Sequence, residues 1–391
     1  MITPLPDNTT QPDAPAPDAS GVAALPPALA AKKPRAKKPK RPPFPVKKPL
    51  RVLVLIDKAC DFPDDTPDID LDAPDLKLPP YRTELSVYRA LTAMGHEVRK
   101  LPASDDLAPI KSAIDEFQPA VAFNLLEGFH DYHVFDQHVV SYLELVEQPY
   151  TGCNPRGLTL ARDKAITKKI LTYHRIHVPK FAVFPRRKQV ARPKWLEFPL
   201  FVKSVNVEGS VGIAKASIVR DDDELRERVR FIHEAVGTYA IAEQYIEGRE
   251  LYVGVTGNLR LSTFPIWELV ADNAPADMPL LATERVKWSI AYRQKYGITT
   301  RAAVDLPAGH DKLLPHVSKR IYRHLNLTGY ARLDFRMAVN GELYLIEANP
   351  NPQIARGEDF AESALAAGIS YESLLQQILN LGMQYSPHLI H

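Results

Sequence analysis

Two acidic side chains and one amide stand close together in the segment GYARLDFRMAVNGELYLIEANPNP, residues 329–352. Asp334 comes first, Glu347 follows after a 13-residue gap, and Asn349 lies two residues further on. Carboxylate and amide oxygens are the ligands that hard cations such as Mg²⁺ take in proteins. The segment therefore indicates a metal site, although the solvated polar face of an amphipathic hairpin also explains its residue types.

A β-hairpin would bring these three side chains together. The alternation in YARLDFRM divides its residues between an apolar face (Leu333, Phe335, Met337) and a polar face (Arg332, Asp334, Arg336). Asn340-Gly341 predicts a two-residue turn in which both positions need positive φ. The resulting register sets Val339 opposite Glu342, Asp334 opposite Glu347 and Arg332 opposite Asn349. Opposed carboxylates, roughly 4.5–5.5 Å apart at their Cβ atoms, repel each other unless a cation lies between them.

The composition favours a large folded body. The chain has 391 residues, 45% of them hydrophobic, which is enough for two or three structural units. Its two cysteines, Cys60 and Cys153, have neither the number of a disulfide framework nor the spacing of a metal site. This usage is typical of the reducing cytoplasm. No apolar run approaches the roughly 20 residues of a membrane span.

The basic residues are concentrated in an N-terminal tail, residues 1–49. Residues 1–50 hold 13 of the 35 prolines, and nine Lys or Arg against three Asp give them a net charge of +6. The other 341 residues therefore carry −4 of the chain's net +2. A segment with so little to bury is expected to be disordered. It either attracts nucleic acid or an anionic surface, or serves as a solubilising tail.

Strands and helices alternate after the tail. The pattern predicts strands at 50–57, 96–102 and 120–128, a helix within 81–98 that stops at Gly95, and a helix at 106–117. This alternation is typical of an open parallel sheet. Ligands of such sheets bind beyond the carboxyl ends of the strands, here near Asp57 and residues 124–128.

Further elements lead to the hairpin. The pattern predicts helices at 157–175, 221–236, 311–326 and 370–382, strands at 198–205 and 239–246, and a hairpin in LYVGVTGNLRLS (251–262). Lys203 is unusual within its apolar strand, because a buried lysine is costly unless it meets an anion such as a phosphate. The turn EGSVG (208–212) follows this strand, and its glycines leave room for an anion at the backbone N–H groups.

The order of these motifs resembles the ATP-grasp superfamily, and most closely its D-alanine–D-alanine ligase branch. The likeness covers roughly residues 50–383. It is carried by YTGCNPRGLTLARDKAITKKIL (150–171), EGSVGIAKA (208–216), EQYIEGRE (243–250), QKYGITTRAAVDLPAG (294–309) and the metal hairpin. The resemblance implies an α/β protein with α+β elements: an ATP-grasp fold with an N-terminal open parallel sheet, preceded by the disordered tail. The implied domains are the tail (1–49), an N-terminal α/β domain (50–156), a central ATP-grasp subdomain (157–242) and a C-terminal ATP-grasp subdomain with the metal hairpin (243–391).

The resemblance also implies which residues bind ATP. They are Lys164, Lys203, Glu208, Ser210, Val211, Glu243, Tyr245, Ile246, Glu250 and Lys295. The first two lysines would lie against the phosphates, the residues of the 208–212 turn would cover them, and Lys295 would close over the γ-phosphate from a mobile loop. Tyr245 and Ile246 would present backbone groups to adenine, and Glu250 would accept from the ribose hydroxyls. Taken singly, an exposed helix position, a turn or a strand end also explains each residue.

The implied reaction forms an amide at the expense of ATP. A carboxylate attacks the γ-phosphate and becomes an acyl phosphate, and an amine then attacks through a tetrahedral oxyanion. Two Mg²⁺ ions, with Mn²⁺ as an alternative, would be held by Asp334, Glu347 and Asn349 and would offset the charge on the phosphates. Arg332 would stabilise the oxyanion, unless it is only the ion-pair partner of a neighbouring carboxylate.

The substrate end departs from the family pattern. The stretch NPQIARGEDF (351–360) stands where the family has small residues with a serine, and Glu127 stands where the family has a histidine. Glu84 corresponds to the acid that holds the first amino group, but an acid in the first turn of a helix is also an ordinary choice. The sequence thus implies a carboxylate–amine ligase with an altered substrate pocket.

Three interpretations follow from the sequence. The protein is a D-alanine–D-alanine ligase that makes a peptidoglycan precursor, a ligase for other amino acids or a peptide, or an ATP-binding regulatory protein that has lost the chemistry. Its partners would be these small molecules, and a second copy of the chain in a homodimer is a further candidate partner.

Overall fold

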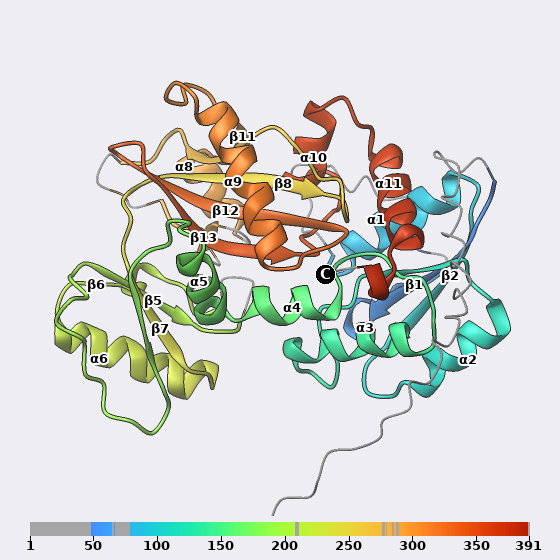
Figure 1. Cartoon of the computed structure of the whole chain (residues 1–391), viewed down its shortest axis with the longest axis horizontal. Coiled ribbons are helices and arrows are strands. Elements are labelled where there is room, and N and C mark those ends of the chain that lie inside the picture. The colour runs from blue at the N-terminus through green and yellow to red at the C-terminus, as the bar shows by residue number, and fades with distance from the viewer. Residues whose placement is uncertain are drawn as a thin grey trace, which may run out of the picture. The chain divides into compact units, whose positions relative to one another are not determined.

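The computed structural model of the chain describes residues 48–389 apart from 65, 67–78, 208–210, 276–277, 279, 284 and 287–288. These residues belong to one compact unit within 42–391 and form three β-sheets with helices around them (Figure 1). Residues 1–47 of the expected tail, together with Glu208 and Ser210, lie outside the described residues. The subdomain boundaries at 156/157 and 242/243 stay a prediction.

The first sheet is parallel, as the alternation of strands and helices predicts. β1 (Arg51–Asp57) lies between β2 (Glu97–Ala103) and β3 (Val121–Asn124). Its helices are α1 (Arg82–Ala93), α2 (Ala108–Phe117) and α3 (Asp136–Leu145). All five residues from Val52 to Ile56 are fully buried, which explains the uninterrupted apolar run of β1.

The second sheet is antiparallel, in the order β4-β7-β5-β6. Its strands are β4 (Phe181–Phe184), β5 (Leu200–Ser204), β6 (Ile218–Val219) and β7 (Ala240–Gln244). The helices of this part are α4 (Pro155–Arg162), α5 (Lys164–Tyr173) and α6 (Asp222–Phe231), which continues into a π-helical turn at Ile232–Val236. The prediction of one helix over 157–175 is wrong, because Asp163 has an extended ψ of 98° and caps α5 by accepting from the Ala165 and Ile166 N–H groups.

The third sheet is also antiparallel and contains the hairpin that is predicted to bind a metal. It consists of β8 (Gly248–Thr256), β9 (Ser262–Thr263), β10 (Trp267–Ala271), β11 (Ile298–Ala302), β12 (Tyr330–Ala338) and β13 (Leu343–Pro350). Its helices are α8 (Ile290–Tyr296), α9 (His310–His324), α10 (Asp359–Ala366) and α11 (Tyr371–Gln384). The segment 294–309, expected as a loop, contains the end of α8 and all of β11, so that expectation is wrong.

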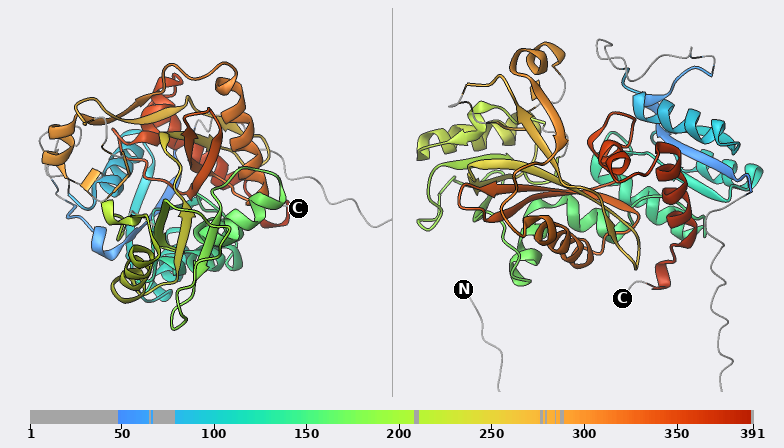
Figure 2. Two further views of the ribbon diagram at one scale, coloured as in Figure 1. Left: turned by 90° about the vertical axis from the view of Figure 1, so that its left-hand side faces the viewer. Right: turned by 90° about the horizontal axis from the view of Figure 1, so that it is seen from above.

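The last helix returns to the first sheet. In Figure 2, α11 lies alongside α1 and the first sheet. Leu375 and Ile378 of α11 share one buried cluster with Val54 and Phe123 of the sheet and Leu85 of α1. Burial of this cluster joins the two ends of the described chain into one hydrophobic core.

The hairpin reaches the expected register by an unexpected route. Asp334 pairs with Glu347 and Arg332 with Asn349, as the sequence predicts. The predicted two-residue turn is wrong. The Ala338 N–H donates to the Glu342 carbonyl at 2.8 Å and closes a three-residue loop, 339–341, in which only Gly341, at φ +85°, has positive φ. A bulge at Ile346 then shifts the register by one residue and restores the predicted pairs.

Candidate active site

A cleft that is open to solvent is lined by residues of both antiparallel sheets and by Lys164 of α5. It collects ten of the residues that the sequence singles out: Lys164, Lys203, Val211, Glu243, Tyr245, Ile246, Glu250, Arg332, Asp334 and Glu347. Asn349 does not line the cleft itself, but its Nδ2 donates to Asp334 Oδ2 at 2.9 Å. The structure therefore brings together side chains that are up to 183 positions apart between Lys164 and Glu347.

Two lysines enclose one glutamate beneath the cleft. Lys203 of β5 and Glu243 of β7 are 4% and 2% exposed, with Lys203 Nζ 3.3 Å from Glu243 Oε1. Lys168 of α5, at 1% exposure, has its Nζ at the same distance from the same oxygen. This oxygen accepts no hydrogen bond from the described residues in spite of its two ion pairs. The two ammonium groups offset its charge, but this buried acceptor is still without a hydrogen bond among the described residues.

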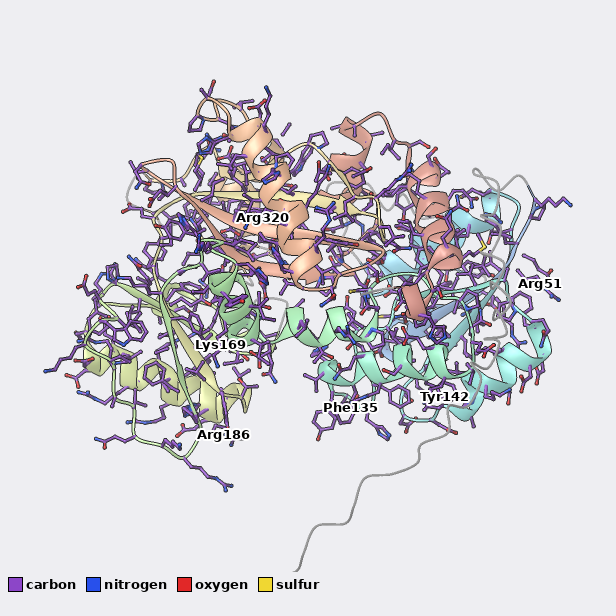
Figure 3. All side chains as sticks on the ribbon, in the orientation of Figure 1. Arg51, Phe135, Tyr142, Lys169, Arg186 and Arg320 are labelled. Atoms are coloured by element: carbon purple, nitrogen blue, oxygen red, sulfur yellow. The ribbon has the colours of Figure 1, made fainter. Side chains whose placement is uncertain are left out.

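Lys168 is a functional candidate that sequence reasoning missed. Its Nζ donates to the carbonyl of Ile346, the bulged residue of β13, at 3.1 Å. Burial lowers the pKa of Lys168 to about 8, although the attraction of Glu243 opposes this shift. The sequence offers one indication, since Lys168 lies four positions after Lys164 and so on the same side of the helix. Lys169, one position further on, is exposed (Figure 3).

Lys164 connects the helix to the metal hairpin. It is the first residue of α5 and is 5% exposed. Its Nζ lies 2.7 Å from Glu347 Oε1 and donates to the Val207 carbonyl at 3.0 Å, immediately before the phosphate-loop motif. The Lys164 ammonium thus lies between the Glu347 carboxylate and the carbonyl of Val207. A cation in this position could bind phosphate oxygens.

Arg332 neutralises the first carboxylate of the hairpin. Its Nε and Nη2 donate to Asp334 Oδ1 and Oδ2 at 2.8 and 2.9 Å, so the ion pair that the sequence allows as an alternative is present. Burial raises the pKa of Asp334, the guanidinium opposes that shift, and Glu347 adds to it. The Asn349 amide nitrogen also points at Asp334, which leaves its oxygen for another donor or a cation.

The donor set suits Mg²⁺ that is shared with a nucleotide. Among the described residues, no group of three or more His, Cys, Asp and Glu side chains is placed to hold a metal by itself. Asp334 and Glu347 supply two opposed carboxylates. Mg²⁺ is usually held by one or two carboxylates together with substrate phosphates and water, and the two carboxylates with the Asn349 oxygen match that pattern.

Some groups of the residues predicted to bind adenine and ribose already have partners in the protein. The N–H of Tyr245 donates to the Pro199 carbonyl at 3.0 Å, so this group already has a partner. Glu250 accepts from the Tyr252 hydroxyl and from Arg336 Nη2, each at 2.9 Å. Arg336, which is 6% exposed, was expected only as part of the polar strand face, and the structure shows that it fixes the Glu250 carboxylate.

Besides Asn349, two of the predicted residues that the structure describes do not line the cleft. Lys295 is exposed in the last turn of α8, with its Nζ 4.9 Å from the ring centroid of Tyr296, and not on a loop. Glu84 of α1 is 6% exposed and lies within electrostatic range of Asp57 and Glu127, which lie at the end of β1 and in the segment after β3. Burial, followed by the charges of Glu127 and Asp57, raises the pKa of Glu84 to about 7. Its Oε2 has no hydrogen-bond partner among the described residues.

Known proteins resemble the chain in sequence and in structure. Residues 170–380 match the family described as D-ala D-ala ligase C-terminus. A D-alanine–D-alanine ligase of Syntrophotalea carbinolica is 32% identical over 304 residues, which cover 76% of this chain and 89% of that protein. The uncharacterized protein y4sG of Sinorhizobium fredii is 28% identical over 304 residues, with 76% and 86% covered. The crystal structure of a Bacillus anthracis D-alanine–D-alanine ligase complexed with ATP has a TM-score of 0.65 at 22% identity, covering 86% of this chain and 98% of that chain.

The two antiparallel sheets and the cleft that they line define an ATP-grasp fold, and the relatives make the chain an ATP-dependent ligase that forms carbon–nitrogen bonds. The chain belongs to the D-alanine–D-alanine ligase family. None of the helices in the described residues is long and apolar enough to cross a membrane.

Proposed function

We propose that the protein binds ATP in the cleft and transfers its γ-phosphate to a carboxylate. The observation that carries this proposal is the convergence of Lys164 and Lys203 with Asp334 and Glu347 in one cleft. The carboxylate becomes an acyl phosphate and ADP leaves. An amine then attacks the acyl carbon, loses a proton and expels phosphate, which leaves an amide.

The proposed nucleotide contacts follow the lining of the cleft. Lys164 and Lys203 would neutralise phosphate oxygens, and the turn at 208–212, of which Val211 lines the cleft, would cover them. The Tyr245 carbonyl and the unsatisfied Glu243 oxygen would accept from adenine. Lys295 remains a proposed γ-phosphate contact, and it would have to approach the cleft from its exposed place on α8.

Asp334, Glu347 and Asn349 are the proposed ligands of Mg²⁺. When bound, the ion would draw charge from the transferring phosphoryl group. The protein's own part is to hold the two carboxylates opposite each other and to keep Lys164 against Glu347. Arg332 is the proposed donor to the oxyanion of the amide-forming step, because its guanidinium lines the cleft beside Asp334.

The substrates are proposed as amino acids or a short peptide. D-alanine is the first carboxylate to test, because curated relatives carry that substrate in their names. Use of another amine is the second candidate, and the charged loop 351–360 favours it. A regulatory protein without chemistry is the remaining alternative, against which the complete set of Arg332, Asp334, Glu347 and Asn349 argues.

Phosphate release from ATP and Mg²⁺ tests the proposed function, with D- and L-amino acids supplied singly and in pairs and products identified by mass. We expect substrate-dependent release in the wild type, and a loss of at least about 100-fold in Asp334→Asn, since one oxygen donor of the metal is replaced by a poor one. Lys169→Ala, on an exposed position of α5, is the control and should keep the wild-type rate. Wild-type turnover in Asp334→Asn would refute the metal assignment.

Two further proposals concern partners. The basic tail would contact nucleic acid or an anionic surface through its net charge of +6 over residues 1–50. Deletion of residues 1–48 should then lower the salt concentration at which the protein leaves heparin, and unchanged retention would refute it. A homodimer is checked by measuring the molar mass in solution.

A further inference from the structure

A second hollow lies on the opposite face of β12 from the cleft. It has a volume of about 520 Å³ and is lined by α9, by the loop after α5 and by the loop of the hairpin. Phe335 of β12 lines this hollow, whereas its two neighbours in the chain, Asp334 and Arg336, line the cleft. Successive side chains of a strand point to opposite faces, so β12 separates the two sites. A hollow of this volume is in the range of pockets that bind small molecules.

The most buried residues that line the hollow are apolar. Ile176 and Phe335 are 5% and 1% exposed, and Val317 of α9 and Leu343 of β13 are partly buried in the same cluster. Leu313 of α9 is half exposed and continues this apolar surface toward solvent. A ligand in the hollow would therefore bury an apolar body against these side chains.

Two guanidinium groups line the same hollow. Arg320 of α9, labelled in Figure 3, donates through Nη2 to the His174 carbonyl at 2.9 Å. Arg175 follows α5 and is exposed, and its side chain forms no hydrogen bond or ion pair with the described residues. A guanidinium carries five N–H donors in a planar fork that suits a carboxylate or a phosphate. Both arginines therefore have donors left for an anion.

The acid in the lining does not neutralise these two cations. Among the described residues that line the hollow, the single acid is Glu342, which is exposed and accepts from the Tyr344 hydroxyl at 2.8 Å. Two arginines and one glutamate give the lining a formal charge of +1 while its histidines are neutral. The chain after residue 50 has a net charge of −4, so this hollow is locally of the opposite sign. Its field favours an anion.

We propose that this hollow binds a small organic anion, with an aromatic or branched aliphatic body that carries a carboxylate or a phosphate. The body would lie on Ile176, Val317 and Phe335, and the anionic group would meet Arg175 and Arg320. This ligand is not a substrate of the cleft, because β12 separates it from the groups proposed to react. The basic tail is an unsuitable occupant, since its charge has the same sign as the hollow. The inference does not depend on the proposed function.

Titration calorimetry of the full chain tests the proposal, with ADP and Mg²⁺ in excess so that the probes compete with nucleotide for the cleft. The probes are 2-naphthoate and 2-naphthyl phosphate. Their controls are 2-naphthalenemethanol, which has the body without the charge, and acetate, which has the charge without the body. We expect one of the naphthyl anions to bind once per chain and at least about tenfold more tightly than either control. Binding of neither anion, or equal affinity for the alcohol, would overturn the proposal.

Variants show whether the anion binds in this hollow. Arg175→Gln and Arg320→Gln should each weaken binding by about tenfold, because each removes a charged donor. Arg323→Gln is the matched control: it removes the same charge from an exposed position of α9 that does not line the hollow, and it should change the affinity by less than about twofold. Equal weakening in all three variants would mean general attraction to a basic surface. Unchanged affinity in both lining variants would mean another binding site. Either result would refute the proposal.

A variant that fills the hollow tests its apolar part. Val317→Trp adds volume beside Ile176 and Phe335 and should abolish binding of the naphthyl anion. Binding at wild-type affinity in this variant would show that the body of the probe lies elsewhere. Arg175→Gln decides the test if another variant does not fold, because the Arg175 side chain is exposed and its loss breaks no contact among the described residues. None of these measurements uses turnover, so a failure of the proposed function would leave their outcome unaffected.

Discussion

Lys168 contacts two of the three sheets through its ammonium group. Its ammonium lies between Glu243 of the second sheet and the Ile346 carbonyl of the third. Replacement by methionine keeps most of the volume but leaves Glu243 with one ammonium partner instead of two. We expect Lys168→Met to lower the free energy of unfolding by about 1–3 kcal/mol, since the Ile346 carbonyl loses a donor and Glu243 keeps only Lys203 as its partner.

Urea unfolding measures this effect, and the neighbouring position supplies a matched control. Lys169 is on the same helix but exposed, so Lys169→Met should change the free energy of unfolding by less than about 0.5 kcal/mol. Equal effects in the two variants would show that the ion pair of Lys168 contributes nothing beyond helix propensity.

Glu84 makes the stability of the protein depend on pH. Burial raises its pKa from 4.5 to about 7, so between these values the folded state holds a proton that the unfolded state has lost. The free energy of unfolding contributed by Glu84 therefore falls as pH rises from 4.5 to 7, by roughly 3 kcal/mol at most. Glu84→Gln, which cannot ionise, should gain stability relative to the wild type between pH 5 and pH 8.

Urea unfolding of both proteins at pH 5 and pH 8 gives this difference directly. Asp115→Asn serves as the control, because the acid that it removes lies in an exposed surface pair. A constant gap between wild type and Glu84→Gln across this range would mean that Glu84 ionises in the folded state as it does in the unfolded chain.

At the scale of elements, the sequence predicted the pairs of the hairpin but not the way in which they form. Period-two alternation and the Asn-Gly turn gave the correct partners for Asp334 and Arg332, because the three-residue loop and the bulge at Ile346 cancel. Alternation cannot reveal a bulge, since the extra residue is apolar and the pattern continues on both sides. The break at Asp163 was missed for a similar reason, because apolar spacing continues across α4 and α5.

A residue of the candidate site could be predicted from the sequence where its type is energetically unfavourable in the helix or strand that contains it. Lys203 stands out in a buried strand, and the hairpin carboxylates oppose each other, so both are visible in the sequence. Lys168 and Arg336 are not, because helix and strand faces accept such residues at exposed positions and only tertiary packing buries them. The occupied N–H of Tyr245 is likewise a tertiary feature, made by Pro199 from another part of the chain.

The loop of the hairpin should tolerate a deletion. Val339 is 89% exposed, and the Ala338–Glu342 pair encloses it. Without Val339, Asn340-Gly341 would form the two-residue turn that this dipeptide favours, and the pairs of the strands would stay as they are. We expect the deletion variant to keep ATP-dependent turnover within about twofold, measured by phosphate release. A loss as large as that of Asp334→Asn would mean that this loop, and not the strand register, controls the carboxylates.

At the scale of the whole described body, the backbone of α11 packs directly against the backbone at Tyr150 and Thr151. A Cβ added at Gly382 would lie 2.4 Å from the Tyr150 carbonyl oxygen, 2.8 Å from its carbon and 3.1 Å from the Thr151 nitrogen. Backbone atoms cannot rotate away as a side chain can, so Gly382→Ala must push α11 outward. We expect a loss of about 1–3 kcal/mol, seen as a fall in the thermal midpoint.

The response should extend beyond the helix, because α11 shares its buried cluster with α1 and the first sheet. Hydrogen exchange in Gly382→Ala should therefore increase in β1 and β3 as well as in α11, whereas Gln377→Ala, on a half-buried position of the same helix, should leave exchange in both strands unchanged. Faster exchange confined to α11 would show that the helix opens independently of the sheet, and the two ends of the chain would then not unfold as one cooperative unit.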